Sequence, residues 1–71
     1  MKRVTKANEL GLGDSVLVIE GKFKQPGKVN SYDAGKPVIY TENIVMAFNP
    51  TPDAKTQVYL LDQENDPEYF L

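Results

Sequence analysis

Lysines interspersed with aromatic residues are the part of this 71-residue chain with the greatest capacity for chemistry. The series consists of Lys22, Phe23, Lys24, Lys28, Tyr32 and Lys36. A lysine ammonium binds a phosphate or a carboxylate, and a neighbouring ring stacks on a base or fills an apolar pocket. We therefore expect this series to bind RNA or an acidic patch on a protein. The competing interpretation is that the lysines keep a small domain soluble while Phe23 covers an open end of its core.

The sequence contains few residues of the types that usually catalyse a reaction. The chain contains no Cys and no His, which excludes a thiolate nucleophile, an imidazole base, a disulfide and the usual Cys/His zinc site. The carboxylates of Glu20, Asp33, Glu42 and Asp53 stand beside predicted turns, where water solvates them. We therefore predict a protein that is not an enzyme, with no cofactor and no small-molecule substrate.

A second candidate surface lies in the acidic C-terminal part. Residues 1–40 carry seven basic and four acidic residues, whereas residues 41–71 carry one lysine and six acidic residues. The candidate residues are Asp62, Glu64, Asp66, Tyr69 and Phe70. Such segregation allows one basic and one acidic face on the same molecule, each with its own partner. The terminal residues Tyr69 to Leu71 are expected to pack on the body of the domain or to enter a groove of a partner.

The same acidic segment has the beginning of a calcium-loop pattern. Asp62, Glu64 and Asp66 occupy alternate positions, as the first three ligands of such a loop do. Pro67 stands where the sixth position of the loop needs Gly, and the chain ends before the twelfth position. We therefore predict a solvated acidic tail and no metal site.

The elements that must position these residues are predicted to be β-strands. With 41% apolar and 25% charged residues, the chain is expected to form a single small domain over residues 1–71, with a core over 13–61 and an acidic tail over 62–71. Short apolar stretches separated by Gly, Pro, Asn and Asp predict five strands, over 15–20, 28–32, 38–41, 44–48 and 57–61. Asp66-Pro67-Glu68 predicts a short helical turn.

Five short strands in so small a chain cannot bury both faces as a flat sheet. We therefore expect an all-β fold, a five-stranded SH3-like barrel that is closed or half-closed, with a short C-terminal turn. The predicted core consists of Val16, Val18, Val29, Val38, Tyr40, Ile44, Met46, Val58 and Leu60.

Residues 13–29 resemble a KOW motif, which joins a valine-rich strand to a loop containing Gly and Lys and then to a Gly-Lys-hydrophobic step into the next strand. In this chain, Gly21 and Gly27 are expected to allow reversal at the two ends of the loop. Asn43-Ile44-Val45 is similar to the Asn-Ile-Val that follows the motif in the large-subunit ribosomal protein of this family. The resemblance covers about residues 10–52. It departs from the family where Gln25-Pro26 replaces a middle Gly and where Met46-Ala47-Phe48 replaces basic residues.

This resemblance implies a KOW- or Tudor-like SH3 barrel and a role like that of KOW domains in the elongation factor NusG, which contact RNA polymerase, ribosomal protein or RNA. We therefore expect a non-catalytic binding module that docks on a transcription or translation complex through the loop of residues 21–28. The alternative is a protein-only adaptor or inhibitor, of the kind that phages and mobile elements encode, which uses the acidic half of the chain.

The cellular location is also predicted from the start of the chain. Lys2, Arg3 and Lys6 are similar to the charged start of a signal peptide, but the longest apolar run is only residues 16–19. No stretch approaches the length of a membrane span. The expectation is a cytoplasmic protein with no membrane contact.

Overall fold

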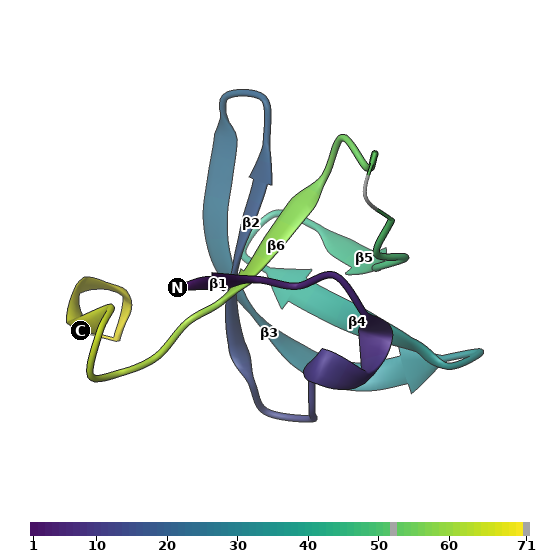
Figure 1. Ribbon diagram of the computed structural model, residues 1–71, viewed down its shortest axis with the longest axis horizontal. Helices are drawn as coiled ribbons and strands as arrows, with labels where there is room; N and C mark the ends of the chain where they lie inside the picture. The colour runs from purple at the N-terminus through teal and green to yellow at the C-terminus, as the bar shows by residue number, and fades with distance from the viewer. Residues whose placement is uncertain (52, 71) are drawn as a thin grey trace.

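The computed structural model describes residues 1–51 and 53–70, and Leu71 lies outside the described residues. Within these residues, six strands form one antiparallel sheet in the order β1-β6-β2-β3-β4-β5 (Figure 1). The elements are β1 Lys2–Arg3, η1 Ala7–Glu9, β2 Ser15–Glu20, β3 Phe23–Asp33, β4 Lys36–Thr41, β5 Val45–Ala47, β6 Gln57–Leu60 and η2 Pro67–Tyr69, where η marks a 3-10 helix. The predicted all-β class is confirmed.

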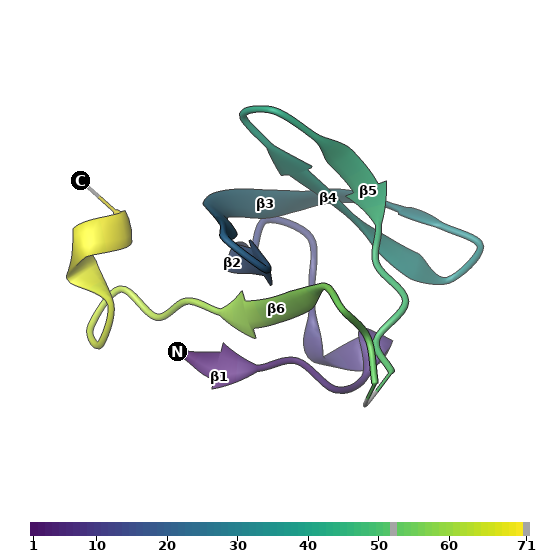
Figure 2. The same ribbon diagram turned by 90° about the horizontal axis from the view of Figure 1, so that it is seen from above.

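The sheet curls around its core, and β3 makes the bend. The first part of this eleven-residue strand pairs with β2 through Lys28, and the later part pairs with β4 from Gly27 onward. Figure 2 shows the result, with β4 and β5 facing β6 and β1 across the interior. Among the described residues β1 and β5 do not pair with each other, so the curled sheet is not closed.

The five predicted strands are all present, and a sixth, β1, adds two residues at the start of the chain. β2 has the predicted bounds, but β3 begins five residues earlier than expected, so the predicted loop over 21–28 is wrong. Only Gly21, at a φ of 59°, and Lys22 form the turn. Gly27 lies within β3 and makes no reversal.

The position of Pro26 in the ladder explains why this proline does not interrupt β3. It is opposite Leu17 of β2, and the bond from the Val29 N–H to the Asp14 carbonyl fixes which pairs of this ladder are hydrogen-bonded. Leu17 and Pro26 then form a non-hydrogen-bonded pair, so the proline nitrogen faces away from β2. Pairing with β4 starts only at Gly27, so no ladder bond is lost on that side either.

The core is one cluster drawn from both halves of the curled sheet. Its buried members are Val4, Leu10, Val16, Val18, Val29, Ile39, Phe48 and Val58, with Phe23, Met46 and Leu60 packed against them. The predictions for Val16, Val18, Val29 and Val58 are confirmed, and Met46 and Leu60 are partly buried.

The predicted core positions Val38, Tyr40 and Ile44 are wrong, because Val38 is only half-buried and the other two are exposed. An irregularity between Val29 and Ser31 shifts the pairing of β3 with β4 by one residue. As a result Val29 faces Ile39, and Tyr40 turns to the outer face of the sheet.

Candidate functional site

A row of side chains crosses the outer face of the sheet. Opposite residues of antiparallel neighbours share a face, and the pairs Ser15–Lys28, Lys28–Tyr40 and Tyr40–Val45 therefore form one line over β2, β3, β4 and β5. Leu61 extends this line beyond β2, since its N–H donates to the Ser15 carbonyl at 2.9 Å. We call these residues, Leu61, Ser15, Lys28, Tyr40 and Val45, the outer row.

A shallow groove of about 320 Å³ follows the outer row. Its lining includes Pro26, Lys28 and Tyr40 of the sheet together with Leu61 and Tyr69 of η2. Tyr40 is 39% exposed and lies opposite Lys28 in the ladder, so its ring and the Lys28 ammonium group are on the same face of the sheet. A ring beside a cation on an open surface suits a planar or anionic ligand.

Two of the predicted lysines lie on this face. Lys24 and Lys28 are exposed and alternate along β3 with half-buried Gln25 and Gly27, so both point outward. Lys22 is exposed in the turn between β2 and β3. Among the described residues, none of these three lysines has a carboxylate within ion-pair distance. Their charges are therefore available to a ligand.

Three other predicted binding residues lie elsewhere. Phe23 points inward and packs against the core cluster. Tyr32 is at the far end of β3, where its hydroxyl donates to the carbonyl of Leu10. Lys36 is opposite Asp33 at the turn between β3 and β4. The six residues of the predicted series are therefore spread along β3: Lys22 and Lys24 lie at one end, Tyr32 and Lys36 at the other, and Lys28 in the middle.

Tyr40 and Val45 belong to the outer row, and the sequence reasoning did not assign them to a site. The apolar residues of β4 permit two phases, with either Pro37 and Ile39 or Val38 and Tyr40 directed inward. A regular hairpin would have placed Tyr40 opposite Val29, in the core. The available signal was Tyr40 itself, because a tyrosine hydroxyl is best accommodated at a surface.

The acidic tail is held to the body by Asp66, which is 7% exposed. Its carboxylate accepts the N–H of Asp62 at 3.1 Å and lies 3.0 Å from the α-amino group of Met1. The hydrogen bond from the Asp62 N–H, aided by the Met1 ammonium, lowers the pKa of Asp66 below its ordinary value. Asp62 in turn accepts the Glu64 N–H and the Asn65 amide, which fixes a tight polar turn.

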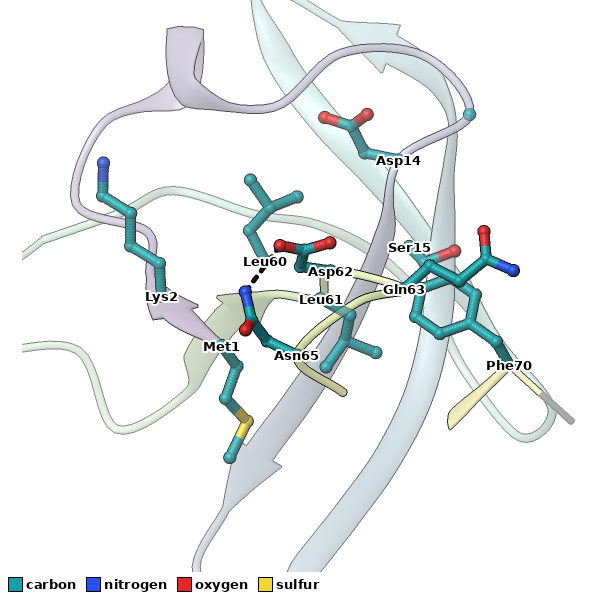
Figure 3. A pocket seen from close by; sticks show the side chains of 11 residues that line it. Met1, Lys2, Asp14, Ser15, Leu60, Leu61, Asp62, Gln63, Asn65 and Phe70 are labelled. Atoms are coloured by element: carbon teal, nitrogen blue, oxygen red, sulfur yellow. Dashed lines mark hydrogen bonds between the residues drawn. The ribbon is translucent and has the colours of Figure 1, made fainter. Parts of the chain in front are cut away.

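A larger groove, of about 650 Å³, lies between this tail and the neighbouring ends of β2 and β6. Figure 3 shows the carboxylates of Asp14 and Asp62, the ring of Phe70, and Met1 around it. Tyr69 instead reaches the groove of the outer row, and Glu64 is exposed to solvent. The five predicted tail residues are thus distributed over an internal contact, two grooves and open surface.

Over residues 1–51 and 53–70, no group of three or more His, Cys, Asp or Glu side chains is arranged to hold a metal ion. In the same part of the chain, no helix has the length and apolar character that crossing a membrane requires.

No protein-family model, no curated protein and no solved structure matches this chain.

Proposed function

We propose that the protein is a non-catalytic binding module with a KOW-type, SH3-like barrel, which docks in the cytoplasm on a transcription or translation complex through RNA. The observation that carries the proposal is the outer face of β3 and β4, where Lys28 and exposed Tyr40 line a groove and Lys24 is exposed on the same face. Lys22 extends the basic surface at the adjoining turn.

The barrel part of the proposal is supported by the curl of the sheet. β3 belongs to both halves, and the core cluster combines residues of β2 and β6 with residues of β4 and the segment after β5. A sheet whose two halves share one core has the form of a half-closed barrel. In a chain of this size, such a curled sheet exposes less surface than a flat sheet would.

The RNA part is supported by the chemistry of the groove. Phosphates bind to unpaired ammonium groups without regard to sequence, and an unstacked base can lie on the ring of Tyr40. The groove is shallow and open along the outer row, which suits an extended single strand better than a duplex.

A salt titration of single-stranded RNA binding tests this proposal. Contacts between three phosphates and Lys22, Lys24 and Lys28 predict a slope of about −2 to −3 for log K against log salt concentration. The triple Ala variant of these lysines should flatten the slope to near zero. Tyr40→Ala should weaken binding by about 1–3 kcal/mol and leave the slope unchanged, because the ring contributes stacking and no charge.

The control removes the same charge from other places, with Lys6, Lys36 and Lys55 changed to Ala. All three are exposed and lie outside the outer row. This control should keep most of the affinity. RNA binding that is lost equally in both triple variants, or absent at low salt, would contradict the proposal.

The alternative function, a protein adaptor or inhibitor that binds through the acidic tail, is favoured by one observation. Asp66 and the turn that follows Asp62 hold an ordered acidic segment against the body, with Glu64 and Glu68 exposed. Reversing the charges of exposed Glu64 and Glu68 to Lys, with Asp62 and Asp66 kept because they order the tail, should abolish capture of a partner protein in this case. The lysine triple variant should then capture it normally.

A further inference from the structure

The β5 edge of the sheet has the properties of a pairing surface. β5 is the last strand in the sheet order, and among the described residues it pairs with β4 alone. Val45 is 61% exposed, and its neighbours Ile44 and Tyr40 are also exposed apolar side chains. An open strand edge with exposed apolar residues is a template for a further strand.

The register shows which backbone groups face outward. The Thr41 N–H donates to the Ile44 carbonyl at 2.8 Å, and the Phe48 N–H donates to the Pro37 carbonyl at 2.8 Å. Hydrogen-bonded and non-hydrogen-bonded pairs alternate along an antiparallel ladder. Val45, opposite Tyr40, and Ala47, opposite Val38, are therefore the non-hydrogen-bonded positions, and their N–H and C=O groups point away from β4.

The sequence around this edge lacks the usual protection against pairing. Residues 43–49, Asn-Ile-Val-Met-Ala-Phe-Asn, contain no charge, no Pro and no Gly. Short segments with high β-propensity and no charge are those that add strands most readily. Because the segment is uncharged, an identical segment can approach it without electrostatic repulsion.

We propose that β5 pairs antiparallel with β5 of a second copy of this chain, around a two-fold axis at Met46. In this register Val45 is opposite Ala47 of the second copy, and Ala47 is opposite its Val45. These are the residues whose backbone groups face outward, so each pair exchanges two N–H···O bonds. The larger Val45 also lies across from the smaller Ala47, which suits close packing between the strands.

The paired edges continue the outer face of both sheets. Tyr40 and Val45 of one copy come into line with Ala47 and Val38 of the other, because these residues already pair within each copy. The polar ends match too, since Asn43 of one copy lies across from Asn49 of the other. The contact is a three-residue strand, well below the area of a stable dimer, so the association is weak, with a dissociation constant of about 10 μM to 1 mM.

Sedimentation equilibrium of the full chain up to about 1 mM tests the proposal. The weight-average mass should rise with concentration from that of the monomer towards that of the dimer and no further. Amide NMR spectra over the same range should shift most at Val45 and Ala47. A chain that stays monomeric, or higher oligomers without a dimer limit, would overturn the proposal.

Two variants separate edge pairing from other contacts. Ala47→Pro removes a donor that faces away from β4, and Val45→Lys places a charge on the edge; each should raise the dissociation constant at least tenfold. Ala47→Ser keeps the N–H and should associate as the wild type does. Leu12→Lys makes the same charge change at a residue that is 66% exposed in the turn before β2, and it should leave association unchanged. Association that survives both Ala47→Pro and Val45→Lys would place the contact elsewhere and refute the pairing.

Discussion

The two ends of the sheet are stabilised in different ways. At the β1 end, two basic residues form the edge, and charged contacts tie the segment down: Lys2 lies 3.7 Å from Glu9, and the Met1 amine lies 3.0 Å from Asp66. At the β5 end, residues 43–49 carry no charge, and backbone hydrogen bonds to β4 together with packing of Phe48 hold the strand.

The two ends therefore differ in how their stability responds to pH and in how readily they accept a further strand. The β1 end depends on ionised groups, so its stability responds to pH, and its lysine and arginine discourage a further strand. The β5 end depends on close backbone packing, so its stability is independent of those ionisations, and its edge accepts a further strand. Substitutions at the two ends should therefore change the free energy of unfolding by different amounts and with a different dependence on pH.

The largest effect is expected where β3 and β4 approach each other most closely. A Cβ on Gly27 would lie 2.6 Å from the carbonyl oxygen of Tyr40, a distance that real Cβ atoms do not show. Gly27→Ala should therefore force β4 away from β3 and lower the free energy of unfolding by about 1–3 kcal/mol. Urea denaturation at pH 7 and at pH 4 measures this loss, which should be the same at both values.

Gly11→Ala is the matched control. A Cβ at Gly11 would meet only the Asp14 carboxylate, at an ordinary 3.7 Å, so the midpoint of unfolding should hardly change. Equal effects of the two substitutions would show that β4 has room to move, and the description of the β5 end as tightly packed would be wrong.

A smaller change of opposite sign is expected at the hairpin between β3 and β4. Ala34 has a φ of 51° and the following Gly35 a φ of 79°, a pair of left-handed residues typical of a two-residue hairpin turn. Alanine is strained in this region, whereas asparagine adopts it readily. Ala34→Asn should therefore raise the free energy of unfolding by about 0.5–1 kcal/mol, as measured by urea denaturation.

Ala34→Val provides the opposite test, since a β-branched residue tolerates a positive φ least. It should destabilise the protein at pH 7 and pH 4 alike. A stable Val variant would show that the turn relaxes to another conformation, and the hairpin would not then fix the register of the β5 end.

Local patterns predicted the strands but not every register. The apolar run of β2 specified its bounds, and Pro67 after Asp66 marked the start of η2, because these signals depend on neighbouring residues only. The extension of β3 through Pro26 and Gly27 could not be read locally. It depends on which side of the strand is paired at each position, a property of the assembled sheet.

In the candidate site, too, the sequence predicted the residue types but not the face of the sheet on which each side chain lies. Lys24 and Lys28 were selected from the sequence for their charge, and both lie on the outer face. Phe23 was expected at that surface and instead packs on the core, while Tyr40 moved from the expected core to the groove. A one-residue irregularity near Asn30 decides the position of Tyr40, and nothing in residues 28–32 distinguishes an irregular pairing from a regular one.

The smallest effect, and the one that depends on pH, is expected at the β1 end. Asp66 has a lowered pKa because it accepts the Asp62 N–H and faces the Met1 ammonium. Glu9 has a lowered pKa because it accepts hydrogen bonds from the N–H and hydroxyl of Thr5 and from the N–H of Lys6. A carboxyl whose pKa is lower in the folded state stabilises the protein above its unfolded pKa, and this stabilisation is lost as the pH falls through the folded value.

Wild-type stability should therefore decline as the pH falls below about 4, the ordinary value for an aspartate. Asp66→Asn should be less stable than the wild type at pH 7, with a shallower decline below pH 4, because its amide cannot ionise. Glu64→Gln is the control, since the Glu64 carboxylate accepts no hydrogen bond from the described residues. This variant should keep the wild-type stability at pH 7 and the wild-type decline below pH 4. If Asp66→Asn kept the wild-type slope, the tail would be held by packing of Tyr69 and Phe70 instead of by charge. The two ends of the sheet would then not differ in the way proposed.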